Sequence, residues 1–255
     1  MTLKIVTGPL GPLTVRVVDD DARSGPPDLV VVLCHGFGAT GTDLVPLGRE
    51  CFERQDKLMG RVRFVFPRGP LSADPDDADS PSRCWWHLDM VRLQRAMAAG
   101  GEMASANDTP PGLADARKGM KAMVEALLLQ TKLPMSKIII GGFSQGAMLA
   151  TDVALRLNEA PAALAILSGA PVCADEWKQL APKRAGLKVL QSHGTHDPLL
   201  KLSWGKHVQS ILDDAGLQVR FVEFSGGHGI DGSVVDALAA LIAEALPTAG
   251  AAGAT

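Results

Sequence analysis

One pentapeptide constrains the fold of this chain more than any other stretch. Residues 142–146 read Gly-Phe-Ser-Gln-Gly and fit the pattern G-x-S-x-G. A β-branched run at residues 137–141 precedes it, as expected of a buried parallel strand, and residues 147–157 form an apolar run typical of a helix. A strand that turns sharply into a helix at a serine is a nucleophile elbow. This context favours Ser144 as a nucleophile over a chance match to the pattern.

The two glycines of the pentapeptide have a predicted mechanical role. Gly142 and Gly146 lack a Cβ atom, so neighbouring backbone can pass close to a strained turn. The start of the following helix brings backbone N–H groups and the positive end of the helix dipole beside Ser144. We therefore expect the serine side chain to lie next to a helix N-terminus.

Strands alternate with helices along most of the chain. Residues 3–6 and 13–18 predict an N-terminal hairpin. Further strands are predicted at residues 29–34, 62–66, 163–167, 187–192 and 218–224. Helices are predicted at residues 43–55 and 113–130, from about residues 175 and 202, and at 231–246. The alternation implies crossover connections and an α/β fold with a mostly parallel central sheet flanked by helices.

The domain organisation follows from length and composition. A chain of 255 residues suits one large α/β domain, predicted here as residues 1–246. The tail at residues 247–255 has nothing to bury and is expected to be mobile.

Residues 67–111 interrupt the alternation. They carry clusters of Pro, Gly, Asp and Ser around a Cys-Trp-Trp-His run, followed by a short amphipathic stretch near residues 91–97. So long an excursion in a compact domain is usually functional or disordered, and its aromatic and methionine residues favour function. We predict a cap over the active site in which Trp85 and Trp86 line the substrate pocket. Two adjacent tryptophans bury large areas, so a place in the core is the alternative.

A general base must activate the serine, because its hydroxyl is a poor nucleophile at its free pKa. Proteins with a nucleophile elbow carry the acid after the serine and the histidine last. His228 lies in a glycine-rich loop between the last predicted strand and helix, where open α/β sheets place their sites. A surface residue is the alternative for a lone loop histidine. His193 ends a strand, His196 precedes the acid, and His207 lies within a helix.

The candidate acid is Asp197, which directly follows the strand predicted at residues 187–192. A carboxylate there can accept a hydrogen bond from the imidazole and fix its tautomer. Asp197 is also suited to cap a turn ahead of Pro198, and that role does not exclude catalysis. Asp175 and Asp231 are weaker candidates.

An oxyanion hole needs two backbone donors aimed at the developing charge. One is expected to be the N–H of Gln145, directly after the nucleophile. The other is expected from residues 35–41, His-Gly-Phe-Gly-Ala-Thr-Gly, which follow a predicted strand. Glycine-rich turns also bind phosphates, but this one lacks the lysine of a P-loop.

Several classes of function are disfavoured. The net charge of −3, with no basic stripe, argues against a nucleic-acid partner. The apolar runs are strand-sized, so no integral membrane span is expected, and the N-terminus lacks a signal-peptide pattern. The four cysteines show neither CxxC pairing nor zinc-ligand spacing, and no HExxH appears. We expect a cytoplasmic protein without metal or cofactor.

The segments that carry these candidates resemble the carboxylesterase/phospholipase family of serine hydrolases, which includes acyl-protein thioesterases. They are residues 34–41, 66–70, 141–147, 193–198 and 227–228. The resemblance spans nearly the whole chain. It implies an α/β-hydrolase fold, a triad of Ser144, Asp197 and His228, and oxyanion donors at the N–H groups of Phe37 and Gln145.

The chain departs from the thioesterase pattern in two places. Residues 85–87 read Trp-Trp-His, where thioesterases carry a tryptophan, an aromatic residue and an aspartate. Residues 87–111 also form a longer stretch than in those enzymes. Both departures fall on the predicted substrate surface, so the chemistry transfers better than the specificity.

The function predicted from the sequence is a serine carboxylesterase that works through an acyl-enzyme on a small-molecule or lipid ester. Lysophospholipase or acyl-protein thioesterase action by the same triad is the alternative within enzymes. A non-catalytic binding protein of the same fold is less favoured. Such proteins commonly lose a triad member, whereas Ser144, Asp197 and His228 are all present here. The oligomeric state is left open, with a dimer as one possibility.

Overall fold

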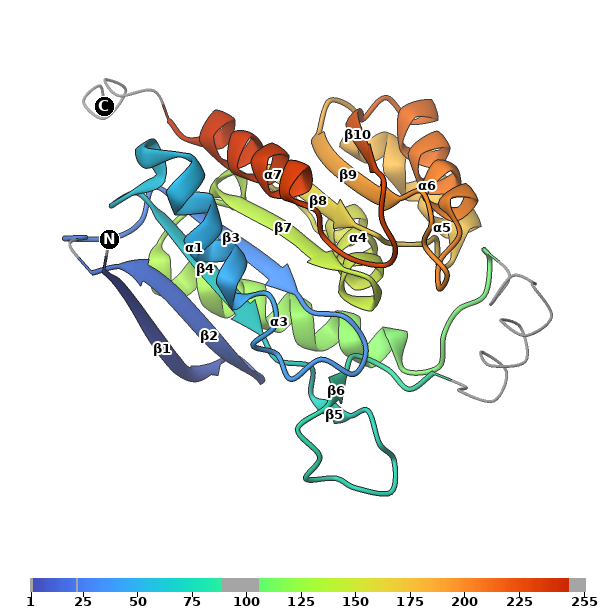
Figure 1. Cartoon of the computed structure of the whole chain (residues 1–255), viewed down its shortest axis with the longest axis horizontal. Helices are drawn as coiled ribbons and strands as arrows, with labels where there is room; N and C mark the ends of the chain where they lie inside the picture. The colour runs from blue at the N-terminus through green and yellow to red at the C-terminus, as the bar shows by residue number, and fades with distance from the viewer. Residues whose placement is uncertain (1, 22, 89–105, 248–255) are drawn as a thin grey trace.

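The computed structural model describes residues 2–21, 23–88 and 106–247 (Figure 1). Within them, eight strands form a central sheet in the order β1-β2-β4-β3-β7-β8-β9-β10. Strand β2 lies between β1 and β4 and is antiparallel to both, whereas β4, β3, β7, β8, β9 and β10 run parallel to one another. The strands are β1 (Leu3–Leu10), β2 (Leu13–Asp20), β3 (Leu29–Cys34), β4 (Val62–Pro67), β7 (Ile138–Phe143), β8 (Ala163–Leu167), β9 (Lys188–Gly194) and β10 (Gln218–Phe224).

Burial along the strands follows their place in the sheet. Every residue of β3 and β8 is buried, because helices cover both faces of a central parallel strand. The edge strands β1 and β10 are largely exposed or half-buried. The continuous apolar runs in the sequence thus correspond to the centre of the sheet.

Helices cover both faces of the sheet (Figure 1). The buried apolar residues form two cores, one on each face. Helices α1 (Val45–Arg54) and α7 (Gly232–Ala245) pack on one face. The other face is covered by α3 (Leu113–Thr131), α4 (Gln145–Arg156), α5 (Ala174–Leu180) and α6 (Leu202–Asp214). Three short 3-10 turns of the described chain, η1 (Asp56–Leu58), η2 (Met135–Lys137) and η3 (Ala181–Arg184), complete the connections.

The predicted α/β-hydrolase architecture is confirmed, with shifts of a few residues at element ends. The elbow strand begins at Ile138 rather than at residue 137, because Lys137 ends a 3-10 turn, and it extends to Phe143. The helix after it begins at Gln145, directly behind the serine. The early start of α4 brings its N-terminus to the candidate nucleophile.

The excursion at residues 67–111 is described at both ends. After β4 the chain forms a small antiparallel pair, β5 (Leu71–Ser72) and β6 (Arg83–Cys84). The predicted amphipathic stretch at residues 91–97 lies outside the described residues, as does most of the predicted tail. The cap and the domain limits stay predictions. None of the helices in the described ranges is long and apolar enough to cross a membrane.

Candidate active site

Ser144 sits in a strained turn between the end of β7 and the start of α4. Its backbone has φ 54° and ψ −120°, in the positive-φ region that non-glycine residues rarely occupy. The Ser144 N–H donates to the Leu167 carbonyl at 2.9 Å, and the Ala147 N–H donates to the Ser144 carbonyl at 3.0 Å. Such strain persists where surrounding contacts hold it and is concentrated at functional sites.

The glycines on either side of the serine are required by close backbone contacts. A Cβ on Gly142 would lie 2.5 Å from the carbonyl carbon of Gly146 and 2.6 Å from the Cys34 carbonyl oxygen. A Cβ on Gly146 would overlap the Cys34 carbonyl oxygen. The expectation that these glycines let backbone pass beside the elbow is confirmed.

His228 reaches Ser144 from the loop after β10. Its Nε2 lies 2.8 Å from Ser144 Oγ, and its ring centroid lies 4.9 Å from that of Phe143. The loop is tied to its neighbours on both sides of the histidine. The Gly226 carbonyl accepts from the His196 N–H at 2.9 Å, and the Gly229 carbonyl accepts from Ser168 Oγ at 3.1 Å.

Asp197 lies on the far side of the imidazole, in the turn after β9. Its Oδ2 is 2.6 Å from His228 Nδ1, and its Oδ1 accepts from the N–H groups of Leu199 and Leu200 at 2.8 and 2.9 Å. Burial opposes ionisation, but the hydrogen bonds from His228, Leu200 and Leu199 outweigh it and lower the pKa of Asp197. Because the carboxylate only accepts, Nδ1 carries the hydrogen and Nε2 can accept from the serine.

The weaker acid candidates have other partners. Asp231 caps α7, where its Oδ1 accepts from the Ser233 N–H at 2.8 Å. Asp175 is exposed and pairs with Lys178 at 3.3 Å. Of the three carboxylates weighed from the sequence, the structure brings Asp197 to His228.

The loop of residues 35–41 passes directly beside the nucleophile. A Cβ on Gly36 would lie 3.3 Å from the Ser144 Cβ. Phe37 is the next residue in the chain, and its predicted role as an oxyanion donor stays a prediction. Two backbone bonds to β6 hold this loop: Gly38 N–H to the Arg83 carbonyl at 2.9 Å, and Arg83 N–H to the Ala39 carbonyl at 2.8 Å.

The His35 side chain holds the loop of residues 35–41 through two hydrogen bonds. Its Nε2 accepts from the Gly69 N–H at 2.8 Å, so Nδ1 carries the hydrogen and donates to the Gly36 carbonyl at 2.7 Å. Burial lowers the pKa of His35. A Cβ on Gly69 would lie 2.6 Å from the Cys84 carbonyl oxygen, so glycine is needed there too. The sequence motifs around residues 35 and 69 are therefore joined directly by a hydrogen bond.

The side chain of Gln145 has a role that the sequence did not indicate. It is 2% exposed; Oε1 accepts from the Trp85 N–H at 3.0 Å, and Nε2 donates to the Trp86 carbonyl at 2.8 Å. The Trp85 indole N–H donates to the His35 carbonyl at 2.9 Å. Gln145 thus joins the tryptophan pair to the elbow. A polar residue directly ahead of the apolar residues 146–150 was the available signal.

Both tryptophans are enclosed. Trp85 and Trp86 are each 1% exposed and belong to the core that α3 and α4 share. The indole N–H of Trp86 has no hydrogen-bond partner among the described residues. Their predicted role in lining a substrate pocket stays a prediction.

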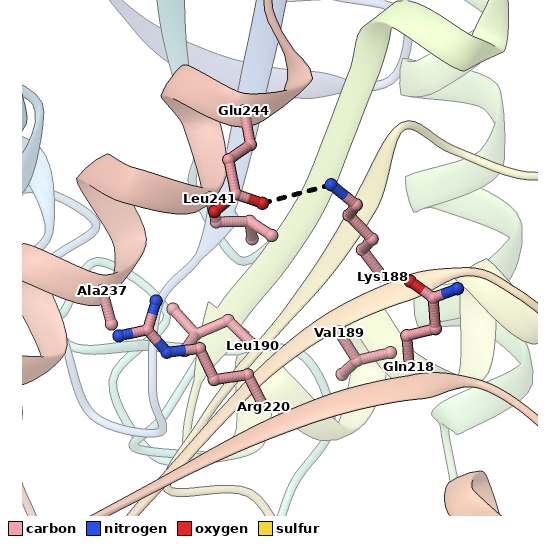
Figure 2. A pocket seen from close by; sticks show the side chains of 8 residues that line it. All are labelled: Lys188, Val189, Leu190, Gln218, Arg220, Ala237, Leu241 and Glu244. Carbon is pink, nitrogen blue, oxygen red and sulfur yellow. Dashed lines mark hydrogen bonds and ion pairs between the residues drawn. The ribbon is translucent and has the colours of Figure 1, made fainter.

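A separate pocket lies at the opposite end of β9. It is a cavity of about 180 Å³ between β9, β10 and α7, where Lys188 reaches across to Glu244 at 3.1 Å (Figure 2). Lys188 is the first residue of β9, whereas Asp197 follows its last, so this pocket is remote from Ser144. Within the described ranges, no three His, Cys, Asp or Glu residues are grouped to bind a metal ion.

Comparison with known proteins agrees with this geometry. Residues 21–246 match the model of the phospholipase/carboxylesterase family. The chain is 25% identical to acyl-protein thioesterase 1 homolog 1 of Dictyostelium discoideum over 85% of this chain and 90% of that one. It is 27% identical to acyl-protein thioesterase 1 of Mycosarcoma maydis over 79% and 83% of the two chains.

Solved structures give the same result. The crystal structure of esterase PE8 superposes with a TM-score of 0.72 at 26% identity, covering 96% of this chain and all of that one. A carboxylesterase from Mesorhizobium loti has a TM-score of 0.69 at 17% identity over 95% and 99% of the two chains, which shows a shared fold. This chain therefore belongs to the phospholipase/carboxylesterase family of serine hydrolases and is an ester-hydrolysing enzyme.

Proposed function

We propose that the enzyme hydrolyses carboxylic esters through a triad of Ser144, His228 and Asp197 and a covalent acyl-enzyme. The observation that carries the proposal is a continuous pair of hydrogen bonds. Asp197 Oδ2 lies 2.6 Å from His228 Nδ1, and His228 Nε2 lies 2.8 Å from Ser144 Oγ. Nucleophile, base and orienting acid are thus within reach of one another, as general-base activation of a serine requires.

In the first half of the reaction, Ser144 Oγ attacks the ester carbonyl carbon while its proton passes to His228 Nε2. Asp197 remains a carboxylate and stabilises the imidazolium that forms, so the Nδ1 hydrogen stays on His228. Collapse of the tetrahedral intermediate breaks the bond to the alcohol oxygen, and His228 returns the proton to that oxygen. The alcohol leaves, and the acyl group stays on Ser144.

In the second half, water attacks the acyl-enzyme. His228 Nε2 accepts a proton from the water, and the second intermediate collapses to the carboxylic acid and free Ser144, which recovers its proton from His228. In both halves the N–H groups of Phe37 and Gln145 are proposed to bind the oxyanion. Gly36, which precedes Phe37, lies beside Ser144, and α4 begins at Gln145, which supports this role.

Thioester or lysophospholipid hydrolysis by the same triad is the second candidate, because the relatives named above are acyl-protein thioesterases. The chemistry on Ser144 would be the same, and the leaving group would be a thiolate or a lysolipid backbone.

The proposal also places Trp86 at the wall of an acyl pocket. It assigns the protein to a reducing compartment such as the cytoplasm, since the four cysteines of the sequence are free and buried.

A substrate panel tests the choice between these activities. We would measure kcat/KM for the native chain and for Ser144→Ala on p-nitrophenyl esters of two to twelve carbons, on thioesters with the same acyl groups, and on lysophosphatidylcholine. Hydrolysis without enzyme is the background. The proposal predicts the highest values on the carboxylic esters and none above background for Ser144→Ala. Thioesters or lysolipids turned over about 100-fold faster than matched esters would favour the second candidate, and an active Ser144→Ala enzyme would rule out the triad.

A further inference from the structure

Strand β9 carries an unusual run of buried polar side chains. Gln191, Ser192 and His193 are at most 1% exposed, although parallel strands covered on both faces are normally apolar. Among the described residues each of the three has one side-chain atom without a hydrogen-bond partner. Burying polar groups in this way costs stability, so a compensating role is expected.

His193 is the member of this run that reaches the catalytic acid. Its Nε2 lies 2.7 Å from the Leu200 carbonyl oxygen and 3.6 Å from Asp197 Oδ2. A carbonyl oxygen can only accept, so Nε2 carries a hydrogen and donates it to Leu200. On the other side of the ring, Gly205 of α6 packs so closely that a Cβ there would lie 2.7 Å from Nδ1. The imidazole is therefore wedged between α6 and the turn that holds Asp197.

The turn links His193 to both oxygens of the carboxylate. Leu200 accepts from His193 through its carbonyl and donates through its N–H to Asp197 Oδ1 at 2.9 Å. His193 Nε2 itself lies 3.6 Å from Oδ2, the same oxygen that accepts from His228 Nδ1. Asp197 thus lies between two histidines, one in the core and one toward the serine.

We propose that His193 is a positioning residue for Asp197. Its Nε2–H donates to the Leu200 carbonyl, and the Leu200 N–H donates to Asp197 Oδ1, which keeps the carboxylate aimed at His228. The inference rests on the proposed function, since it takes Asp197 as the acid of the triad. A displacement of about 1 Å in a catalytic group costs roughly 100-fold in rate, so the anchoring of this turn has a measurable consequence.

Two substitutions separate the hydrogen bond from the bulk of the ring. In His193→Gln the amide Nε2 is as many bonds from Cβ as the imidazole Nε2, so the donor to Leu200 is kept. In His193→Met a chain of similar length has no donor. We expect His193→Met to lower kcat by roughly 10- to 100-fold with little change in KM, and His193→Gln to recover most of that loss. Circular dichroism and thermal melts establish the folded fraction used to normalise kcat.

A double-mutant cycle shows whether His193 acts through the acid. In an Asp197→Ala background, His193→Met should lower kcat little further, because the group it positions is gone. If His193→Met leaves kcat unchanged, or lowers it by the same factor in both backgrounds, the inference is wrong. If Asp197→Ala itself keeps normal kcat, the proposed function fails instead.

A second variant keeps the test usable if His193→Met does not fold. Gly205→Ala pushes on the Nδ1 side of the ring without removing any hydrogen-bonding group. It should lower kcat in the native background and not in Asp197→Ala. Ser203→Ala, at an exposed position of the same helix, is the matched control and should leave kcat unchanged. Equal kcat values for Gly205→Ala and Ser203→Ala would contradict the proposal.

Discussion

Two regions are joined by the Gln145 side chain, which bonds to Trp85 and Trp86, and they are held in place by different kinds of contact. The first region, called the sheet edge below, is the line where the parallel strands end at their carboxyl termini. It carries Ser144, Asp197 and His228, which follow β7, β9 and β10, and the hydrogen bonds between the parallel strands set the positions of these ends. The second, residues 69–86, has little regular structure of its own beyond β5 and β6. It is fixed by the buried side chains of His35, Arg83 and Gln145, which form hydrogen bonds with backbone groups of this segment.

The difference predicts which region matters mainly for the reaction and which mainly for stability. At the sheet edge the backbone is placed by strands, so a side chain can be removed with loss of reaction and little loss of fold. In residues 69–86 the side chains themselves place the backbone, so their removal should cost stability first and activity second. The variants below test this contrast, beginning with the largest expected effect.

Removal of the nucleophile or the base should give the largest loss. We expect Ser144→Ala and His228→Ala each to lower kcat by about 10⁶, with the double variant no worse than either single one, because triad members act as a unit. Steady-state kinetics beside thermal melts measure both quantities. Losses in kcat that multiply in the double variant, or a loss of kcat explained by a loss of folded protein in the melts, would contradict the contrast between the regions.

Loss of the acid should have the next largest effect. Asp197→Asn is expected to keep substrate binding and lower kcat by about 10⁴, because an amide N–H facing His228 favours the wrong tautomer. A nearly neutral Asp197→Asn would direct attention to Asp175 or Asp231 as the acid.

The pH profile tests the same pair. Protonation of His228 Nε2 removes the base, while the lowered pKa of Asp197 keeps its carboxylate charged as the pH falls. The acid limb of kcat/KM should therefore show one ionisation. A lowered pKa in the folded state also means that Asp197 stabilises the fold above its unfolded pKa and loses that effect as the pH falls through the folded value. Asp197→Asn should remove this part of the acid dependence, as melts across the acid range would show.

Gln145→Met should reverse the order of effects seen at the sheet edge. The variant leaves the Trp85 N–H and the Trp86 carbonyl without partners in a buried site, at a cost of about 1–3 kcal/mol for each group. We expect a larger fall in the free energy of unfolding than in Ser144→Ala, with a smaller fall in kcat. Gln130→Met, at an exposed position on α3, is the control and should stay within about 0.5 kcal/mol of the native chain. If Gln145→Met and Gln130→Met are equally stable, the Gln145 side chain does not hold the tryptophan pair in place.

The tryptophan pair offers the finest comparison. Trp85→Phe removes the donor to the His35 carbonyl, whereas the Trp86 indole N–H has no partner among the described residues to lose. Both changes remove the same volume from the core. Trp85→Phe should therefore be less stable than Trp86→Phe by about 1 kcal/mol, the net value of one hydrogen bond. Urea unfolding measures the difference, and a less stable Trp86→Phe would contradict it.

The two regions also differ in how far the sequence predicts them. Strands β8 and β10 were predicted with the bounds that the structure has, because each is a short run of strand-forming residues between turn signals. The chain order then led from Ser144 to Asp197 and His228. The side-chain roles of His35 and Gln145 were not predicted, since their partners lie 34 to 60 residues away in the chain. Periodicity reports the local backbone and carries no signal for such contacts.

The central claim is that Ser144 is a nucleophile activated by His228. A fluorophosphonate probe tests it directly, because an activated serine displaces fluoride and keeps the phosphonyl group on Oγ. Peptide mass spectrometry of the labelled protein should find the group on Ser144, with labelling lost in Ser144→Ala and strongly slowed in His228→Ala. Labelling of another residue, or equal labelling of the native chain and Ser144→Ala, would contradict the account.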